Sequence, residues 1–245
     1  MSYRMQLDNA ILAAKRAGEL LRSEFHRPTG PRGTQNHAEV DAEAEIAIRD
    51  QLLSATPAYG FLGEETGRVA SQDPQQHVWI ADPNDGTWHY MKGRRGSAVS
   101  IALLCDSRLV LGVVFAFNYP TDAGDLIAWV EGCEGIQRNG ITLPKRRWAR
   151  ELSTETSVLL SPGADKVPEA NARIVAPARF RTMPSIAYRL ALVAAGEAEA
   201  TVSLNGPRDW DFAAGHALIQ AAGGLLGNDN GRAIVYSTMG DCNRN

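Results

Sequence analysis

A chain of 245 residues with a formal net charge of −3 lacks the basic excess that nucleic-acid-binding surfaces normally carry. Its content of 44% hydrophobic and 22% charged residues is that of a soluble globular protein, which argues against disorder. Cys105, Cys133 and Cys242 have no CxxC spacing, so neither a zinc site nor a disulfide framework is expected. Charges interrupt residues 1–25, so we expect no signal peptide or membrane span there, and a reduced, cytoplasmic compartment fits.

The first half of the chain predicts helices packed against an antiparallel sheet. Apolar residues three and four positions apart predict an amphipathic helix over residues 6–25, and a less regular pattern predicts a second one over residues 40–53. Between them, residues 26–37 are rich in Pro and Gly and are interpreted as a mobile loop. Apolar runs bounded by turn residues predict strands at 59–62, 78–81, 98–104, 110–117, 126–131 and 135–143.

The second half alternates between strand and helix patterns, which is typical of an α/β subdomain. We predict strands at 157–160, 173–176 and 198–203, and helices at 185–196 and 211–222. The basic clusters at 144–150 and 178–182 are interpreted as solvated loop charges. A change of pattern near residue 148 therefore predicts two subdomains, 1–147 and 148–245.

The segment from Asp82 to Thr87 joins the end of a short apolar run to a possible helix start. Asp82, Asn84 and Asp85 offer hard oxygen ligands of the kind that Mg²⁺ prefers. Gly86 and Thr87 would begin a helix, whose free N–H groups favour an anion such as phosphate. The alternative is a plain turn, because Pro, Asn, Asp and Gly are turn formers.

Three further groups of carboxylates occur at the ends of apolar runs or on a helix. Glu64 and Glu65 could be loop charges, Asp211 a helix N-cap, and Asp41 with Glu45 a solvated acidic face. No Ser-His-Asp order and no glycine-rich nucleotide loop is visible. The available chemistry of carboxylates, one hydroxyl and glycine fits multi-metal phosphoester hydrolysis better than other common reactions.

With these residues together, the chain resembles the inositol monophosphatase superfamily, the lithium-sensitive Mg²⁺-dependent phosphomonoesterases. The likeness rests on Asp41 with Glu45, Gly63-Glu64-Glu65, Asp82 to Thr87, Trp210-Asp211, Ala213-Ala214-Gly215 and Ala222-Gly223-Gly224. The resemblance implies a layered α-β-α-β-α sugar-phosphatase-like fold, α+β/α/β in class, with an antiparallel sheet half and a smaller α/β half. It also implies two to three Mg²⁺ ions and a homodimer, with no nucleic acid polymer and no membrane as partner.

The resemblance also implies roles for individual residues. Metal ligands would be Glu64, Asp82, the backbone carbonyl of Asn84, Asp85 and Asp211. The attacking water, activated by metal, would be oriented and deprotonated by Glu64, Thr87 and Asp41. The substrate would be held by Gly86, Thr87, Ser185 and Leu204.

Departures from the family pattern bear on the substrate. Inositol-specific members have a glutamate at the position of Leu204, and Pro184-Ser185 replaces the usual Gly-Ser. Gly206-Pro207 and the helix after Asp211 look more like the bacterial 3′(2′),5′-bisphosphate nucleotidase branch. We expect hydrolysis of an inositol monophosphate or sugar phosphate, with 3′-phosphoadenosine 5′-phosphate as the alternative substrate. A catalytically silent metal- or phosphate-binding relative and a Ca²⁺-binding structural protein are the remaining hypotheses.

Overall fold

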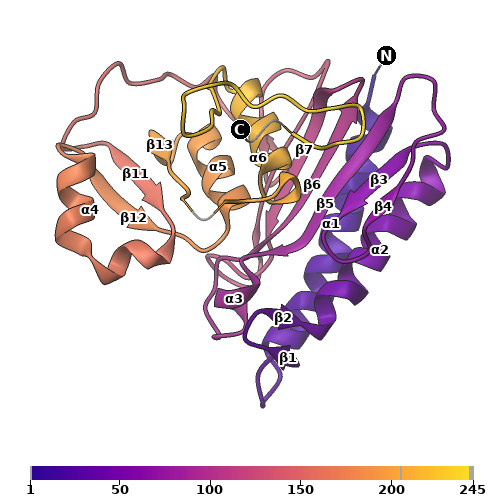
Figure 1. Ribbon diagram of the computed structural model, residues 1–245, viewed down its shortest axis with the longest axis horizontal. Helices are drawn as coiled ribbons and strands as arrows, with labels where there is room; N and C mark the ends of the chain where they lie inside the picture. The colour runs from indigo at the N-terminus through magenta and orange to yellow at the C-terminus, as the bar shows by residue number, and fades with distance from the viewer. Residues whose placement is uncertain (1, 205, 243–245) are drawn as a thin grey trace.

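The computed structural model describes residues 2–204 and 206–242, and its central feature is a mixed sheet. Its strands are β3 (Gly60–Gly63), β4 (Arg68–Val69), β5 (His77–Asp85), β6 (Ala98–Cys105), β7 (Arg108–Ala116), β8 (Asp125–Val130), β9 (Gln137–Arg138) and β10 (Ile141–Thr142). They lie in the order β10-β9-β8-β7-β6-β5-β3-β4, of which Figure 1 labels β7, β6, β5, β3 and β4. Neighbouring strands are antiparallel except β3 and β5, so the predicted antiparallel sheet holds apart from one parallel pair.

Helices cover both faces of this sheet. The helices α1 (Arg4–Phe25) and α2 (Glu39–Ala55) pack on one face, and α5 (Ile186–Ala195) and α6 (Asp209–Ala221) pack on the other. Alternate residues of β5 show this: Val78 and Ile80 join the core beside α5 and α6, whereas Trp79 joins the core beside α1 and α2. A strand buried on both faces needs a continuous apolar run, which is the pattern that the sequence shows there.

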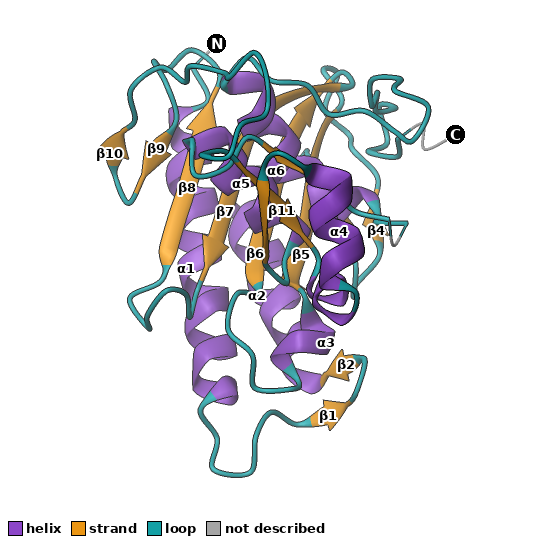
Figure 2. Cartoon of the chain, turned by 90° about the vertical axis from the view of Figure 1, so that its left-hand side faces the viewer, coloured by secondary structure: helices purple, strands orange, loops and turns teal. Residues whose placement is uncertain are grey.

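A smaller parallel sheet adds the outer layers. Its strands are β11 (Ser157–Leu160), β12 (Arg179–Thr182) and β13 (Ala200–Thr201), in the order β12-β11-β13. A 3-10 turn, η1 (Pro162–Lys166), leads into α4 (Pro168–Val175), which packs against β12. Figure 2 shows α4 and β11 in front of α5 and α6, with the large sheet and α1 behind them. The predicted α-β-α-β-α layering is confirmed.

Several predicted elements differ from the structure. The strand predicted at 173–176 is wrong, because these residues end α4, which starts with Pro168 at a favourable helix position. The strand lies instead at β12, within the basic cluster that we interpreted as a loop. The helix predicted from Asp211 begins at Asp209. The segment 26–37, interpreted as a loop, contains β1 (Gly33–Thr34) and leads into its partner β2 (His37–Ala38).

Two expectations from composition concern the described part of the chain. Among residues 2–204 and 206–242, no helix is both long and apolar enough to cross a membrane. No disulfide joins the three cysteines, all of which lie in this part.

Candidate active site

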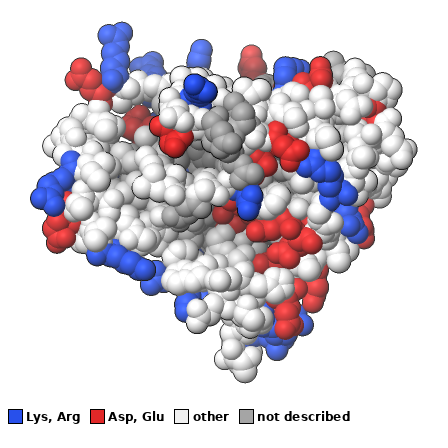
Figure 3. All heavy atoms as spheres, in the orientation of Figure 1, with Lys and Arg blue, Asp and Glu red and all other residues white. Residues whose placement is uncertain are grey.

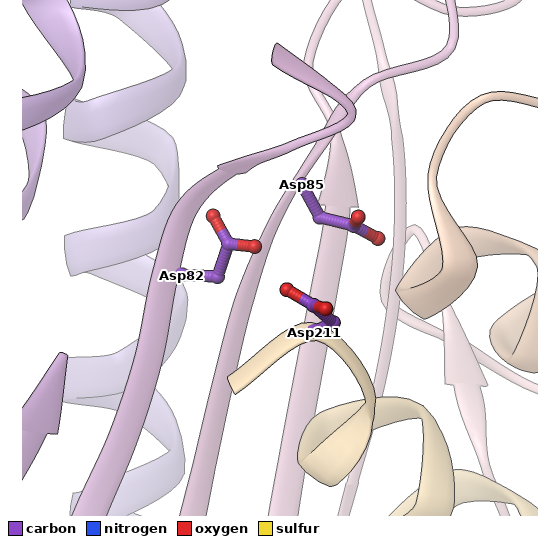
Figure 4. A group of neighbouring side chains, drawn as sticks. All are labelled: Asp82, Asp85 and Asp211. Atoms are coloured by element: carbon purple, nitrogen blue, oxygen red, sulfur yellow. The ribbon is translucent and has the colours of Figure 1, made fainter. Parts of the chain in front are cut away.

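Three aspartates from distant parts of the chain converge at the end of β5. Asp82 and Asp85 come from β5 and Asp211 from the first turn of α6, and one carboxylate oxygen of each lies within 4.8 Å of the others. Figure 4 shows the three side chains close together, between the end of β5 and the start of α6. Residues three apart in a regular strand face opposite sides of the sheet. The register shift in β5 between Asp82 and Asp85 allows both to face α6.

Backbone groups hold two of these aspartates. Asp82 accepts a hydrogen bond of 2.7 Å from the N–H of Asn84, and Asp211 accepts one of 2.6 Å from the N–H of Arg208. Ser100, which is opposite Asp82 on β6, donates to the carbonyl of Trp210 at 2.9 Å. The sheet therefore fixes the start of α6 beside β5.

The third aspartate, Asp85, is held by the start of α5. Its Oδ2 accepts hydrogen bonds from the Ser185 hydroxyl at 2.6 Å and from the Ala187 N–H at 2.7 Å. A helix N-terminus favours a carboxylate through its free N–H groups and its dipole. Ser185 is fully buried and also caps α5 by accepting from the N–H of Tyr188. Sequence reasoning predicted Ser185 as a substrate contact, but the structure gives its hydroxyl to Asp85.

The loop that carries Glu64 is held by a buried glutamate that sequence reasoning missed as a site residue. Glu45 accepts hydrogen bonds from the N–H of Glu65 at 3.0 Å, the N–H of Thr66 at 2.6 Å and the Thr66 hydroxyl at 2.7 Å. A Cβ at Gly63 would lie 2.2 Å from Glu45 Oε1, so only glycine leaves room. The alternative of a solvated acidic face is wrong for Glu45, which is fully buried on α2.

The other buried carboxylate of α2, Asp41, binds the strand-end segment. Its Oδ1 accepts from the Asn84 side-chain amide at 2.9 Å, and its Oδ2 lies 2.9 Å from the Thr87 hydroxyl. That hydroxyl is also 2.9 Å from the backbone carbonyl of Asn84, so the two acceptors share one proton. The carbonyl keeps a second lone pair for the predicted cation. Asp41, Asn84 and Thr87 thus form one connected group beside the aspartate cluster.

Burial and mutual repulsion raise the pKa values of these carboxylates. Burial, followed by the neighbouring Asp211, raises the pKa of Asp85 to about 8, and both effects raise the pKa of Glu64 to about 7 although its side chain reaches solvent. Burial also raises the pKa values of Asp82 and Asp211, and that of Asp41 to about 7. In the described residues, no Lys or Arg side chain forms an ion pair with any of these five.

This arrangement fits a divalent cation with oxygen ligands. Converging carboxylates that form no ion pair with a described Lys or Arg carry charge that a cation would neutralise, and Mg²⁺ prefers such hard oxygen donors. Acidic side chains also gather on the face shown in Figure 3, over the ends of β5 and α2 next to the one-turn helix α3 (Thr87–Tyr90).

The remaining predicted residues lie at two different places. Gly86 precedes α3 with a φ of 103°, a left-handed conformation that favours glycine, and packs against Pro184 at the start of α5. Gly86 and Thr87 therefore lie at the same strand end as Asp82 and Asp85, and their phosphate contacts stay a prediction. Leu204 lies on the loop before α6, where it is 88% exposed and lines a groove together with residues of α5 and α6; its substrate contact stays a prediction.

Comparisons with known proteins agree with this geometry. The model of the "Inositol monophosphatase family" matches residues 4–241. The chain is 32% identical to "Nus factor SuhB" of Escherichia coli over 92% of this chain and 85% of the relative. It is 33% identical to "Inositol-1-monophosphatase" of Caulobacter vibrioides over 88% of this chain and 86% of the relative.

Solved structures show the same fold. The extragenic suppressor protein suhB of Bartonella henselae superposes with a TM-score of 0.74 at 27% identity, over 92% of this chain and 87% of that one. The inositol monophosphatase II of Staphylococcus aureus also gives a TM-score of 0.74, at 25% identity, over 92% of this chain and 85% of that one.

Proposed function

Because the chain belongs to the inositol monophosphatase family, we propose that it is a Mg²⁺-dependent phosphomonoesterase acting on a small phosphate ester. The observation that carries the proposal is the convergence of Asp82, Asp85 and Asp211 beside the Asp41–Thr87 pair. Glu64, Asp82, Asp85, Asp211 and the carbonyl of Asn84 would hold two to three Mg²⁺ ions. When bound, Mg²⁺ lowers the pKa of water and neutralises charge on the phosphoryl group.

The residues beside the carboxylate cluster would bind the attacking water and accept its proton. The Thr87 hydroxyl shares its one proton between Asp41 and the Asn84 carbonyl, which leaves the Thr87 oxygen free to accept a hydrogen bond from a water molecule. Burial raises the pKa of Asp41, which is not among the proposed cation ligands, to about 7, and this suits a general base at neutral pH. Glu64 would orient the same water from its place among the cation ligands. The N–H groups of Gly86 and Thr87 would orient the phosphate oxygens.

The substrate is proposed at the level of class. We propose inositol and sugar phosphates as the first candidate substrates, supported by the name of the Caulobacter relative. The alternative is 3′-phosphoadenosine 5′-phosphate, supported by the sequence around Gly206-Pro207. A further alternative is a catalytically silent relative, because "Nus factor" is not an enzyme name. Homodimerisation and a cytoplasmic location are proposed from family resemblance.

Phosphate release tests the proposal directly. Purified protein is incubated with inositol, sugar and nucleoside phosphates in Mg²⁺ or in EDTA, and inorganic phosphate is measured. We expect release in Mg²⁺ only. Absence of release from every ester at millimolar Mg²⁺, by a protein that stays folded, would favour the silent relative. Light scattering on the same sample gives the oligomeric state.

A further inference from the structure

A hollow of about 420 Å³ lies between α1, the strands β7 and β8 and the β9–β10 hairpin. Figure 2 shows β8 and this hairpin at the edge of the large sheet, beside α1. Two of its lining residues, Phe115 and Leu126, belong to the core on the α1 face of the sheet, whereas the aspartate cluster faces α6. The strand β8 is also three strands away from β5, which is roughly 14 Å at the usual strand spacing. The hollow is therefore separate from the candidate active site.

The floor of the hollow is apolar and fixed in position. Phe115 and Leu126 are almost fully buried there, and Ile11 of α1 adds to the wall. A Cβ at Gly18 would lie 2.6 Å from Phe115 Cε1, and a Cβ at Gly124 would lie 2.5 Å from its Cε2. The two glycines thus let the backbone approach the ring from two sides and hold it in place. Pockets of this size with apolar walls and a few polar groups are typical of sites for small organic molecules.

Three charged side chains of α1, Lys15, Glu19 and Arg22, line the same hollow. Their spacing of four and three residues puts them on one face of the helix, with the negative charge between the two positive ones. In the described part of the chain, none of the three forms an ion pair. Arg22 donates its Nε to the carbonyl of Phe117 at 2.9 Å, which leaves its two Nη groups for a ligand.

We propose that this hollow binds a zwitterionic α-amino acid with an apolar side chain. The carboxylate would bind Lys15 and Arg22, the ammonium group would bind Glu19, and the side chain would cover Phe115. A ligand with only a carboxylate would bring a negative charge beside Glu19, and a ligand with only an ammonium group would bring a positive charge beside Arg22. A polar side chain would lose its hydrogen bonds with water against Phe115. Binding here does not require the proposed phosphatase function.

Titration followed by ¹H–¹⁵N NMR in EDTA tests the hollow without Mg²⁺ and without turnover. The probes are L-phenylalanine, 3-phenylpropionate, which lacks the ammonium group, and 2-phenylethylamine, which lacks the carboxylate. We expect L-phenylalanine to shift the amide signals of residues 123–126 and 137–140 and to leave those of residues 84–87 unchanged. The two analogues should bind at least about tenfold more weakly, because each lacks one charged hydrogen-bonding group.

Variants at exposed positions test the individual contacts. Glu19→Gln should lower the affinity for L-phenylalanine about tenfold without weakening the binding of 3-phenylpropionate. Ala123→Trp, which places a large side chain in the hollow, should abolish binding of L-phenylalanine. Asp8→Asn, at an exposed acidic position of α1 outside the hollow, is the matched control for Glu19→Gln and should bind as the native protein does.

The assignment would be refuted by equal binding of the three compounds, by equal effects of Glu19→Gln and Asp8→Asn, or by no shift up to the solubility limit of L-phenylalanine. Shifts at residues 84–87 in place of the hollow would put the ligand at the aspartate cluster and would also refute it. Because the titration contains no Mg²⁺ and measures no turnover, a failure to release phosphate from any ester would refute the phosphatase function alone.

Discussion

The hydroxyl of Ser185 donates a 2.6 Å hydrogen bond to Asp85, and this bond joins the start of α5 to the end of β5. The N–H of Ala187 donates to the same carboxylate oxygen. The second half of the chain therefore orients a carboxylate that belongs to the first half. Asp85 keeps its other oxygen for a cation.

We expect Ser185→Ala to weaken Mg²⁺ binding about tenfold, because a hydrogen bond to a charged group contributes about 1.5–3 kcal/mol. The Mg²⁺ dependence of phosphate release and calorimetric titration of Mg²⁺ both measure the effect. Ser54→Ala, at an exposed serine near the end of α2, is the control. Unchanged Mg²⁺ affinity in Ser185→Ala would show that Ala187 alone orients Asp85.

Asp82→Asn should abolish Mg²⁺-dependent phosphate release while preserving the fold. In EDTA at pH 8, it should raise the melting temperature by about 3 °C, because it removes a buried ionisable group surrounded by other carboxylates. The stabilisation of the native protein by Mg²⁺ should disappear in this variant. Thermal unfolding with and without Mg²⁺ measures both effects, with the exposed Asp50→Asn as control. Wild-type turnover by Asp82→Asn would refute the site assignment.

The raised pKa values predict a pH dependence of stability with a definite sign. Between about pH 4, where unfolded carboxyl groups ionise, and pH 8, near the pKa of Asp85, the folded protein binds more protons than the unfolded chain. The free energy of unfolding in EDTA should therefore fall as the pH rises through this window and then level off, as far as these groups determine it.

Mg²⁺ must displace the same protons, so its affinity should rise with pH over the upper part of this range. Urea unfolding in EDTA and in Mg²⁺, from pH 5 to pH 9, measures both trends. Asp85→Asn should reduce the slope of the free energy of unfolding against pH in EDTA. A slope in EDTA identical to that of the native protein would mean that Asp85 titrates normally.

Thr87→Ala should lower kcat about a hundredfold with little effect on Mg²⁺ binding, because Thr87 is proposed to position water and to ligate no cation. Thr87→Ser keeps the hydroxyl and should restore most of the activity. Single-turnover kinetics at saturating Mg²⁺ measures the chemical step separately from Mg²⁺ binding. Comparable kcat values for the alanine and serine variants would remove Thr87 from the proton pathway.

Glu45→Gln should loosen the loop carrying Glu64, since one of the two carboxylate oxygens that accept hydrogen bonds there becomes a donor. We expect faster amide hydrogen exchange at residues 65 and 66 and weaker Mg²⁺ binding. Glu43→Gln, at an exposed position of the same helix, is the matched control. Identical exchange in the two variants would assign the loop geometry to the backbone alone.

The sequence allowed prediction where the pattern was local. The apolar run at Val78 to Ala81 predicted a buried strand, and two of the carboxylates after it, Asp82 and Asp85, lie where three aspartates converge. The helix at 168–175 was missed because its two adjacent apolar residues, Ile174 and Val175, look like a short strand. Such short apolar runs fit either element.

Roles that depend on contacts between distant segments could not be predicted. Ser185 was predicted as a substrate contact from the family resemblance, and its hydrogen bond to Asp85, 100 positions away along the chain, leaves no local sign in the sequence. Glu45 showed only its four-residue spacing from Asp41, and spacing does not tell a solvated acidic face from a buried one. Burial follows from packing of α2 on the sheet, which no local pattern encodes.

The placement of Asp211 on α6 has a consequence for synthesis on the ribosome. Asp82 and Asp85 emerge early, whereas Asp211 is added roughly 10 s later at common rates of translation. During that interval the nascent chain has no complete set of carboxylates for a cation. With the proposed ligands, Mg²⁺ would stabilise only a chain that includes α6, and a chain that ends before α6 would gain no such stability.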